Sequence, residues 1–445
     1  MNQFVQVDGE NFKVNGKKIF FRGFGVGSWM NLEHFMIGIP GTDRLIHRAF
    51  RDVFGRDRAA EFFSQFLTEY LSDADFAFLH DMGINLLRLP VNYRYFYSSE
   101  TGLFLENGFH HLDRVLDLCE RHGIYAIIDM HAAPGGQNPD WHCDTDCGIP
   151  LFWEYAALRD VLSAIWSKIS AHYRDNVWVA GYDILNEPSF APENLLKNFY
   201  TEVLAAVRQN DKNHIVFLEG NNFAREFDFL DKPVDPQVAY SCHFYPSVID
   251  PTVLDESTEK TRRAEIYQEA FRPLVRIREK YHRPVWCGEL GLEFNRENIR
   301  FQTQLIREML DLCEQNNISW TLWAYKDAQC MGIVAPKSST PWIRFTSKLK
   351  KKWDQSKEME LGEKAVDQIC EKYLQPVEGN LRYRLQFRMR TLFHTICVEK
   401  YLKPALERTG WEEISRLPES FRFENCFVWD DMCRLVKSYT DIGNR

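Results

Sequence analysis

Eight short apolar runs, rich in β-branched and aromatic residues, recur along the first three quarters of the chain and constrain its fold more than any other feature. They cover residues 18–26, 84–91, 125–132, 179–188, 214–221, 237–245, 284–291 and 319–326. Their apolar residues are continuous rather than alternating with polar ones. This pattern indicates strands that are buried on both faces, as they are in parallel sheets.

Helical patterns separate most of these runs. Residues 110–123 place apolar side chains three and four positions apart and end on Gly123, a typical helix stop. Residues 193–210 and 297–316 follow the same spacing. Eight strands with intervening helices predict an α/β fold, the (β/α)8 or TIM barrel. A doubly wound sheet is the alternative, but it gives no reason for a count of eight.

Two segments lie outside this alternation. Residues 4–14 are expected to form a small hairpin that closes the barrel floor, and the pattern from residue 341 onward is purely helical. We therefore predict a catalytic barrel with its hairpin over residues 1–340. Residues 341–445 would form the last barrel helix and a helical extension packed on the barrel, because no Pro/Gly/Ser linker separates them. Dimerisation through residues 384–398 would give a homo-oligomer.

Composition narrows the function classes. The chain has 445 residues and a net charge of −9 that is spread along its length, which makes nucleic acid an unexpected partner. No run approaches the roughly 18 apolar residues of a membrane span. The first residues lack the basic and apolar regions of a signal peptide. The 11 cysteines include no CxxC pair, and we interpret them as reduced thiols. These features predict a cytoplasmic protein.

Polar residues end six of the eight predicted strands, where a barrel of this kind places its catalytic groups. They are Arg88, His131, Asn186 with Glu187, His243 with Tyr245, Glu289, and Trp323. Any one of them alone is better explained by a structural role. Chance does not account for such residues at six strand ends. The two glutamates among them would face each other across the barrel mouth.

Two facing carboxylates suit glycoside hydrolysis. One must be protonated to donate to the leaving oxygen, and the other must be ionised to attack the sugar or to activate water. In "YDILNEPS" (182–189) the amide of Asn186 stands beside Glu187 and can bind the sugar 2-hydroxyl. Pro188 restricts the backbone behind them and so holds both side chains toward the mouth.

Other readings of the sequence are weaker. "GFGVGS" (23–28) looks like a dinucleotide loop, but no clear helix and no acidic residue follow at the expected spacing. "HCDTDC" (142–147) has no second cysteine cluster, and a metal-dependent barrel hydrolase would have His-x-His after the first strand. We therefore expect neither a cofactor nor a metal. A non-catalytic carbohydrate-binding barrel would keep Trp29, Trp141 and Trp323 but would not need both glutamates.

An ordered set of strand-end motifs resembles glycoside hydrolase family 5. "LNEP" after an apolar strand and "VWCGELG" about a hundred residues later carry the two glutamates. "LLRLP", "IDMH", "CHFYP" and "LWAYK" match the other strand-end motifs of that family in the same order. The resemblance covers about residues 18–326.

This resemblance implies a role for each strand-end residue. Glu187 would be the general acid/base and Glu289 the nucleophile of a retaining mechanism. Asn186 would bind the 2-hydroxyl, while Arg88 and Tyr245 would hold the nucleophile ionised and correctly aimed.

The same resemblance implies a subsite around the reacting sugar. His131 and His243 would shape this subsite, and Trp323 would be its floor.

Two stretches are similar to the exo-β-1,3-glucanase and β-glucosidase branch of the family. They are "GVGSWMNLE" (25–33) and "DMHAAPGGQN" (129–138), although Ser28 replaces a glycine and the loop that follows Asn138 departs from that branch. Glu33 would bind the hydroxyls of a terminal glucose. The other candidate substrate-binding residues in and after these stretches are Trp29, Gln137, Asn138 and Trp141.

We therefore predict a retaining β-glycosidase that acts on a carbohydrate or small β-glycoside. It would release glucose, in exo fashion, from β-glucosides or β-1,3-gluco-oligosaccharides. An endo-β-1,4-glucanase or β-mannanase is the alternative.

Overall fold

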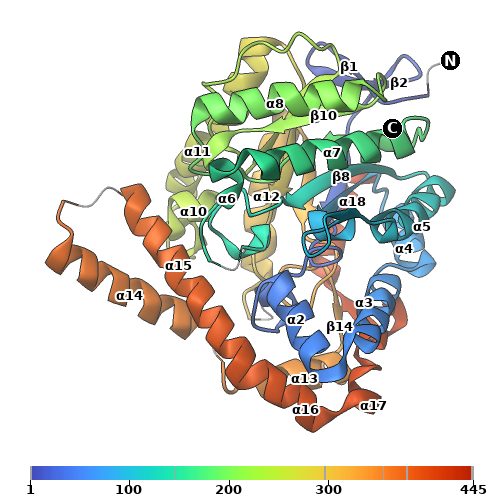
Figure 1. Cartoon of the computed structure of the whole chain (residues 1–445). Helices are drawn as coiled ribbons and strands as arrows, with labels where there is room; N and C mark the ends of the chain where they lie inside the picture. The colour runs from blue at the N-terminus through green and yellow to red at the C-terminus, as the bar shows by residue number, and fades with distance from the viewer. Residues whose placement is uncertain (1–2, 146, 295–296, 354, 377–378, 442–445) are drawn as a thin grey trace.

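The computed structural model describes residues 3–145, 147–294, 297–353, 355–376 and 379–441 (Figure 1). Eight parallel strands close into a barrel around one axis. Around the barrel they are β4 (Arg22–Gly25), β5 (Leu86–Asn92), β8 (Tyr125–Ala132), β9 (Val179–Asp183), β10 (Ile215–Glu219), β11 (Val238–His243), β12 (Val285–Leu290) and β13 (Ser319–Trp323). Each lies within one of the eight predicted runs or extends past it by a single residue, so the (β/α)8 barrel is confirmed.

A small antiparallel sheet closes the floor of the barrel, as the sequence predicts. It consists of β1 (Gln6–Asp8), β2 (Asn11–Val14) and β3 (Lys17–Ile19). Val7 and Phe12 pack against Phe217 and Trp286, which point inward near the amino ends of their strands. The third strand comes from the start of the first apolar run, which the structure divides between the floor and β4.

Helices cover the outside of the barrel. They include α4 (Asp73–Asp81), α5 (Asn107–His122), α7 (Ala156–Tyr173), α8 (Glu193–Arg208), α11 (Lys260–Tyr281) and α12 (Ile299–Gln315). Gly123 ends α5 with a φ of 69°, and its N–H bonds carbonyls of the last turn, which is the predicted helix stop. Between β10 and β11 only the short α9 (Asn221–Ala224) is present, so this side of the barrel mouth is built by a loop.

Further segments are inserted above the barrel mouth. Between β4 and β5 lie α1 (His34–Ile37), α2 (Asp43–Phe54) and α3 (Arg56–Tyr70). The hairpin of β6 (Tyr97–Ser98) and β7 (Leu103–Phe104) follows β5. The short helices α6 (Leu151–Glu154) and α10 (Pro246–Ile249) follow β8 and β11.

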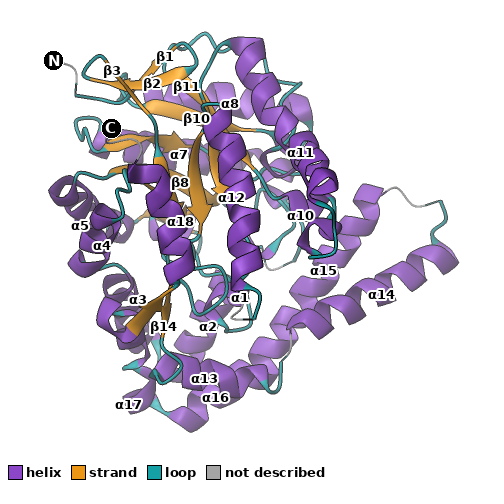
Figure 2. Ribbon diagram, turned by 180° about the vertical axis from the view of Figure 1, so that it is seen from behind, coloured by secondary structure: helices purple, strands orange, loops and turns teal. Residues whose placement is uncertain are grey.

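The residues after β13 form a helical extension that later returns to the barrel. It contains α13 (Pro341–Lys350), α14 (Gln355–Tyr373), α15 (Gly379–Cys397), α16 (Lys403–Thr409) and α17 (Trp411–Ile414). Figures 1 and 2 show α14 and α15 side by side as a hairpin that projects beyond the barrel. The strand β15 (Cys426–Val428), which the helical pattern does not predict, then pairs with β14 (Val334–Pro336).

The final helix, α18 (Asp430–Thr440), packs on the barrel as the outer helix that follows its eighth strand, β13. The Tyr439 hydroxyl donates to Asp311 Oδ1 of α12 (2.6 Å), and the Tyr439 ring contacts that of Trp320 in β13. The Thr440 hydroxyl donates to the carbonyl of Met82, directly after α4 (2.6 Å). The extension is therefore an excursion between the last barrel strand and the last barrel helix.

No helix in the portion of the chain that the structure describes combines the length and the apolar character needed to cross a membrane.

The position of α18 predicts that its inner face contributes strongly to stability. Leu435 is 1% exposed, and Leu435→Ala should lower the free energy of unfolding by about 2–5 kcal/mol, because it leaves a cavity against the barrel. The exposed Lys437 on the same helix is the matched control, and Lys437→Ala should change it by less than about 0.5 kcal/mol. Equal effects of the two variants in urea unfolding would show that α18 is not part of the core.

Candidate active site

A buried arginine at the mouth of the barrel gathers carboxylates from four other strands. Arg88 on β5 is 0% exposed, and its guanidinium lies 3.1 Å from Asp129 on β8, 3.3 Å from Asp183 on β9 and 3.4 Å from Glu219 on β10. It also donates to Glu289 Oε1 on β12. Burial opposes the charge of Arg88, but these carboxylates hold its pKa well above the usual value. Arg88 thus ties strands from both sides of the barrel into one site.

The carboxylates outnumber the cations in this cluster, and protonation reduces the imbalance. Burial, together with the neighbouring Glu219, raises the pKa of Asp183 well above its usual range. Asp183 therefore takes up a proton more readily than an exposed aspartate does. Its Oδ2 lies 3.3 Å from Arg88 Nε and within 3.5 Å of the Ser241 hydroxyl, which also reaches Glu219.

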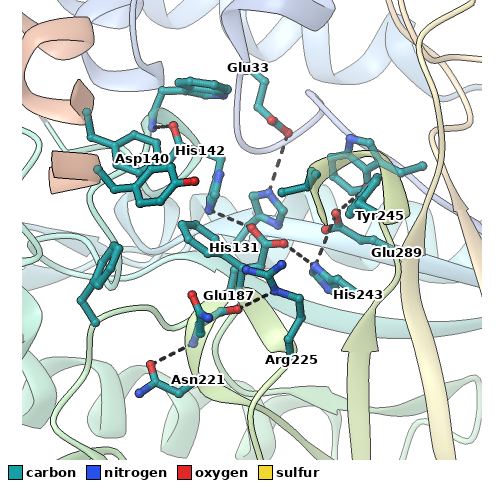
Figure 3. A pocket seen from close by; sticks show the side chains of 18 of the residues that line it. Glu33, His131, Asp140, His142, Glu187, Asn221, Arg225, His243, Tyr245 and Glu289 are labelled. Atoms are coloured by element: carbon teal, nitrogen blue, oxygen red, sulfur yellow. Dashed lines mark hydrogen bonds and ion pairs between the residues drawn. The ribbon is translucent and has the colours of Figure 1, made fainter. Parts of the chain in front are cut away.

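Glu289 is held at both of its carboxylate oxygens. Arg88 donates to Oε1. The Tyr245 hydroxyl donates to Oε2 over 2.8 Å (Figure 3). Burial and the charge of Glu289 raise the pKa of Tyr245 well above its usual value, so the phenol remains a donor. Glu289 is thus fixed in orientation, with its carboxylate facing the cavity.

Glu187 follows β9 on a left-handed backbone turn with φ of 48°. Its N–H donates to Glu219 Oε2 (2.6 Å), which fixes the turn. Its Oε1 lies 2.6 Å from His243 Nδ1, and its Oε2 lies 3.3 Å from His142 Nε2. Burial alone would raise the pKa of Glu187, but His243, followed by His142 and His131, lowers it to about 2.

His243 holds a proton between two glutamates. Its Nδ1 faces Glu187, and its Nε2 lies 3.2 Å from Glu219 Oε1. Burial lowers the pKa of His243, but Glu219, Glu289 and Glu187 together hold it well above the usual value. These shifts favour a proton on His243 and an ionised Glu187 in the unliganded site. The sequence predicts a protonated Glu187 for catalysis, and the neighbouring cation on His243 cannot be inferred without the fold.

The structure brings the two glutamates together across the mouth, as the sequence predicts. One carboxylate oxygen of each and a ring nitrogen of His243 all lie within 4.8 Å of one another. Side chains of these types can bind a divalent cation. Here Arg88 and Tyr245 already bind Glu289, and both ring nitrogens of His243 lie beside carboxylates. The arrangement thus suits proton transfer and attack better than metal binding.

Three predicted substrate-binding residues hold the loop that carries Glu187. Asn186 accepts from Arg88 through Oδ1 (2.7 Å), and its Nδ2 is buried without a hydrogen-bond partner among the described residues. The Gln137 amide donates to the carbonyl of Asn186 (2.8 Å), and that of Asn138 donates to the carbonyl of Glu187 (2.9 Å). Neither Gln137 nor Asn138 lines the cavity, so both position the turn.

Glu33, His131 and Trp323 line a cavity of about 940 Å³ above the two glutamates. Glu33 Oε1 is buried, has no hydrogen-bond partner among the described residues and lies 3.7 Å from His131 Nε2 (Figure 3). Burial, and then the charges of Glu289 and Glu187, raise the pKa of Glu33 well above its usual range. His131 stacks on Trp323 with ring centres 5.4 Å apart, and both rings line this part of the cavity.

The two remaining predicted tryptophans occupy different parts of the structure. Trp141 lines the cavity, and its indole N–H is buried without a partner among the described residues. Trp29 does not reach the cavity. It is 0% exposed, and its indole donates to the carbonyl of Leu67 (3.0 Å), so it belongs to the core behind the site.

The structure adds four functional residues that the sequence analysis does not select: Asp129, Asp183, Glu219 and His142. The first three stand within or at the end of otherwise apolar strands, and an acid in such a run is itself a signal. His142 belongs to "HCDTDC", a segment whose two cysteines suggest a metal site more readily than its histidine suggests an active-site role.

Comparisons with known proteins show the family of the chain. A model described as Cellulase (glycosyl hydrolase family 5) matches residues 56–329. A beta-xylosidase of Phanerodontia chrysosporium is 33% identical over 462 residues, which cover 95% of each chain. A glucan 1,3-beta-glucosidase of Pichia angusta is 24% identical over 54% of this chain and 58% of its own.

Solved structures share the fold. An endogalactoceramidase aligns with a TM-score of 0.55 and 19% identity over 73% of this chain and 75% of its own. Thermotoga maritima Cel5A in complex with mannotriose aligns with a TM-score of 0.52 and 16% identity over 71% of this chain and 92% of its own. With the family model covering more than half of the sequence, the chain belongs to glycosyl hydrolase family 5 and is a glycoside hydrolase.

Proposed function

We propose that this protein is a retaining β-glycosidase that releases one β-linked sugar from a small glycoside. The observation that carries the proposal is the 4.8 Å limit on the separation of an oxygen of Glu187 from one of Glu289. Carboxyl groups of retaining enzymes lie about 5–5.5 Å apart, whereas inverting enzymes need about 6.5–9.5 Å to admit a water. Nearest oxygens within 4.8 Å of each other fit the shorter range and so favour direct attack on the sugar by one of the two carboxylates.

In the first step Glu289 attacks the anomeric carbon while Glu187 gives its proton to the glycosidic oxygen. The bond to the leaving group breaks, and an ester bond between sugar and Glu289 forms. Arg88 and Tyr245 suit Glu289 to this role because they stabilise its anionic form and fix both of its oxygens. Asn186 is buried and is not among the cavity residues, but its unpaired amide donor supports the proposal that it binds the 2-hydroxyl of a bound sugar.

In the second step Glu187 is a carboxylate and takes a proton from water. The water oxygen attacks the anomeric carbon, and the bond to Glu289 breaks. Two displacements on the same carbon return the sugar with its original β configuration.

The proton for the first step is stored on His243. In the unliganded site His243 is the cation and Glu187 the anion, with 2.6 Å between Nδ1 and Oε1. A substrate that displaces water and places an apolar ring face beside Glu187 disfavours its charged form. We propose that the proton then passes across this hydrogen bond to Glu187.

Exo action is supported by Glu33 and by the loops above the mouth. A buried carboxyl with an unpaired oxygen at the cavity wall can bind hydroxyls that only a terminal sugar leaves free. Two relatives are named glucan 1,3-beta-glucosidase and beta-xylosidase, which supports removal of a terminal residue, whereas others are named endoglucanase, which supports the endo alternative. We propose glucose as the sugar. Because one relative is named beta-xylosidase, xylose is the next sugar to test.

Retention is tested by exchanging each glutamate. Glu289→Ala should lose almost all turnover, and azide should restore part of it with an α-glycosyl azide as product, because azide then attacks from the face that Glu289 leaves open. Glu187→Ala with an activated aryl glycoside and azide should give the β-glycosyl azide instead. NMR of the first product of the wild-type enzyme should show the β anomer. An α anomer would exclude the mechanism.

The His243–Glu187 pair predicts the alkaline limb of the pH profile. The productive state carries one proton on the pair, and the pair loses it only above the usual histidine range because the surrounding carboxylates raise the pKa of His243. In His243→Asn the proton must lie on Glu187 alone. The alkaline limb of kcat/KM should therefore move to lower pH, while the folded fraction at each pH stays the same. An unmoved limb would assign that ionisation to another group.

Glu33 predicts exo specificity. Glu33→Ala should lower kcat/KM for an aryl β-glucoside at least about tenfold, equivalent to about 1.4 kcal/mol, because terminal hydroxyls lose their partner. The wild-type enzyme should release monosaccharide from a β-1,3-glucan from the first minutes. Rapid loss of viscosity with mixed oligosaccharides, and no effect of Glu33→Ala, would support the endo-glucanase or mannanase alternative.

A further inference from the structure

The cavity continues beyond the two glutamates to a wall of aromatic side chains. This wall, which we call the aromatic wall, consists of Phe190, Phe223, Tyr383 and Phe387. The ring centre of Phe223 lies 6.3 Å from that of Phe190 and 6.3 Å from that of Phe387. The residues come from the loop after β9, from α9 and from α15, so three separate segments converge on one surface.

The aromatic wall lies on the side of the general acid candidate. Phe190 follows Glu187 by three residues, and the N–H of Phe223 donates to the carbonyl of Pro188 (3.2 Å). In Figure 3, Arg225, which belongs to the same loop as Phe223, lies on the side of Glu187 away from Glu33. Glu187 protonates the leaving oxygen under the proposed function. The group that departs must therefore lie along this wall.

Two rings of the wall stand on strained backbone. Phe190 has a φ of 55° and Phe223 a φ of 60°, in the left-handed region that bulky residues seldom adopt. Asn222 and Ala224 on either side of Phe223 share this conformation. Backbone strain of this kind persists where surrounding contacts impose it and is concentrated at ligand sites. Here it accompanies two phenyl rings at the cavity surface.

Several polar groups around the wall are engaged within the protein, although Arg390 Nε and the indole N–H of Trp141 are buried without a hydrogen-bond partner among the described residues. Asn222 Nδ2 donates to Glu226 Oε1 (3.0 Å), and Arg225 Nε donates to the carbonyl of Asn222 (3.0 Å). Arg390 pairs with Glu363. These partners leave fewer donors for the hydroxyls of a second sugar, and a sugar hydroxyl that loses water without a new partner is costly to bind.

Part of the wall comes from the helical extension, which lies outside the family model. Tyr383 and Phe387 belong to α15, outside residues 56–329 that match the family model. The apolar surface also continues outward, because Tyr383 is 59% exposed, and Val248, which lines the cavity from α10, is 71% exposed. The full cavity of about 940 Å³ is at the upper end of the volumes that hold whole drug-sized ligands, and one sugar ring fills only a part of it.

We propose that the aromatic wall is an aglycone site for apolar leaving groups, such as aryl or long alkyl groups, rather than for a second sugar. This inference rests on the proposed function, because it names the substrate class of the same site. Transfer of an apolar aglycone from water to these rings favours binding in proportion to the apolar area buried. The substrates would be monomeric β-glycosides with one sugar and an apolar aglycone.

The test is a series of alkyl β-glucosides, from methyl to octyl, assayed below their micellar concentrations. With the sugar constant, kcat/KM should rise at least about tenfold from methyl to octyl, because methylene groups enter apolar surroundings. The octyl glucoside should also exceed cellobiose and laminaribiose. In Tyr383→Ala the octyl-to-methyl ratio should fall severalfold. Tyr373→Ala provides the matched control, because Tyr373 is 69% exposed on α14 and is not among the cavity residues, and its ratio should not change.

A flat alkyl series, a preference for the disaccharides, or equal ratios in the two tyrosine variants would overturn the aglycone site. Binding of octyl 1-thio-β-glucoside, which resists hydrolysis, separates this failure from failure of the proposed function. Calorimetry should show tighter binding than that of the methyl thioglucoside, and Tyr383→Ala should reduce the difference. If binding follows this pattern while no β-glycoside is cleaved, the aglycone site stands and the proposed reaction is wrong.

Discussion

The site depends on the buried guanidinium of Arg88. It is surrounded by carboxylates from β8, β9, β10 and β12, and no part of it reaches solvent. Removal of one member of a buried ion pair leaves an uncompensated charge and typically costs about 3–5 kcal/mol. Arginine suits the position because its planar fork can bind several carboxylates at once, which a lysine ammonium does less well. The same contacts that stabilise the barrel mouth therefore orient Glu289.

The protonation states of the groups around Arg88 depend on one another. Glu219 illustrates this, because it contacts Arg88, fixes the backbone of Glu187 and lies beside His243. The proton near Glu187 consequently lies on His243 in the unliganded site. A substrate that excludes water changes this balance, which links binding to readiness for proton transfer.

Much of the fold and of the site could be predicted from the sequence, because the spacing of apolar residues indicates the strands and the positions of polar residues indicate the barrel mouth. Continuous apolar runs gave the strands, and polar residues at their ends gave Glu187, Glu289 and Arg88 together at one mouth. Trp29 was misplaced because an aromatic residue near a motif can point either into the cavity or into the core. The aromatic wall could not be predicted, since it needs α15 to return across some 160 residues of chain to the loop of Phe223.

The central claim is that Glu289 forms a covalent bond to the sugar. The most direct measurement is inactivation by 2,4-dinitrophenyl 2-deoxy-2-fluoro-β-glucoside, in which fluorine slows both displacements and the reactive leaving group allows the first to proceed. Mass spectrometry of the intact protein and of its peptides should find one fluorosugar per chain, attached to Glu289. Attachment to Glu187 or to another residue would contradict the account, as would turnover of the reagent with no adduct at any stage.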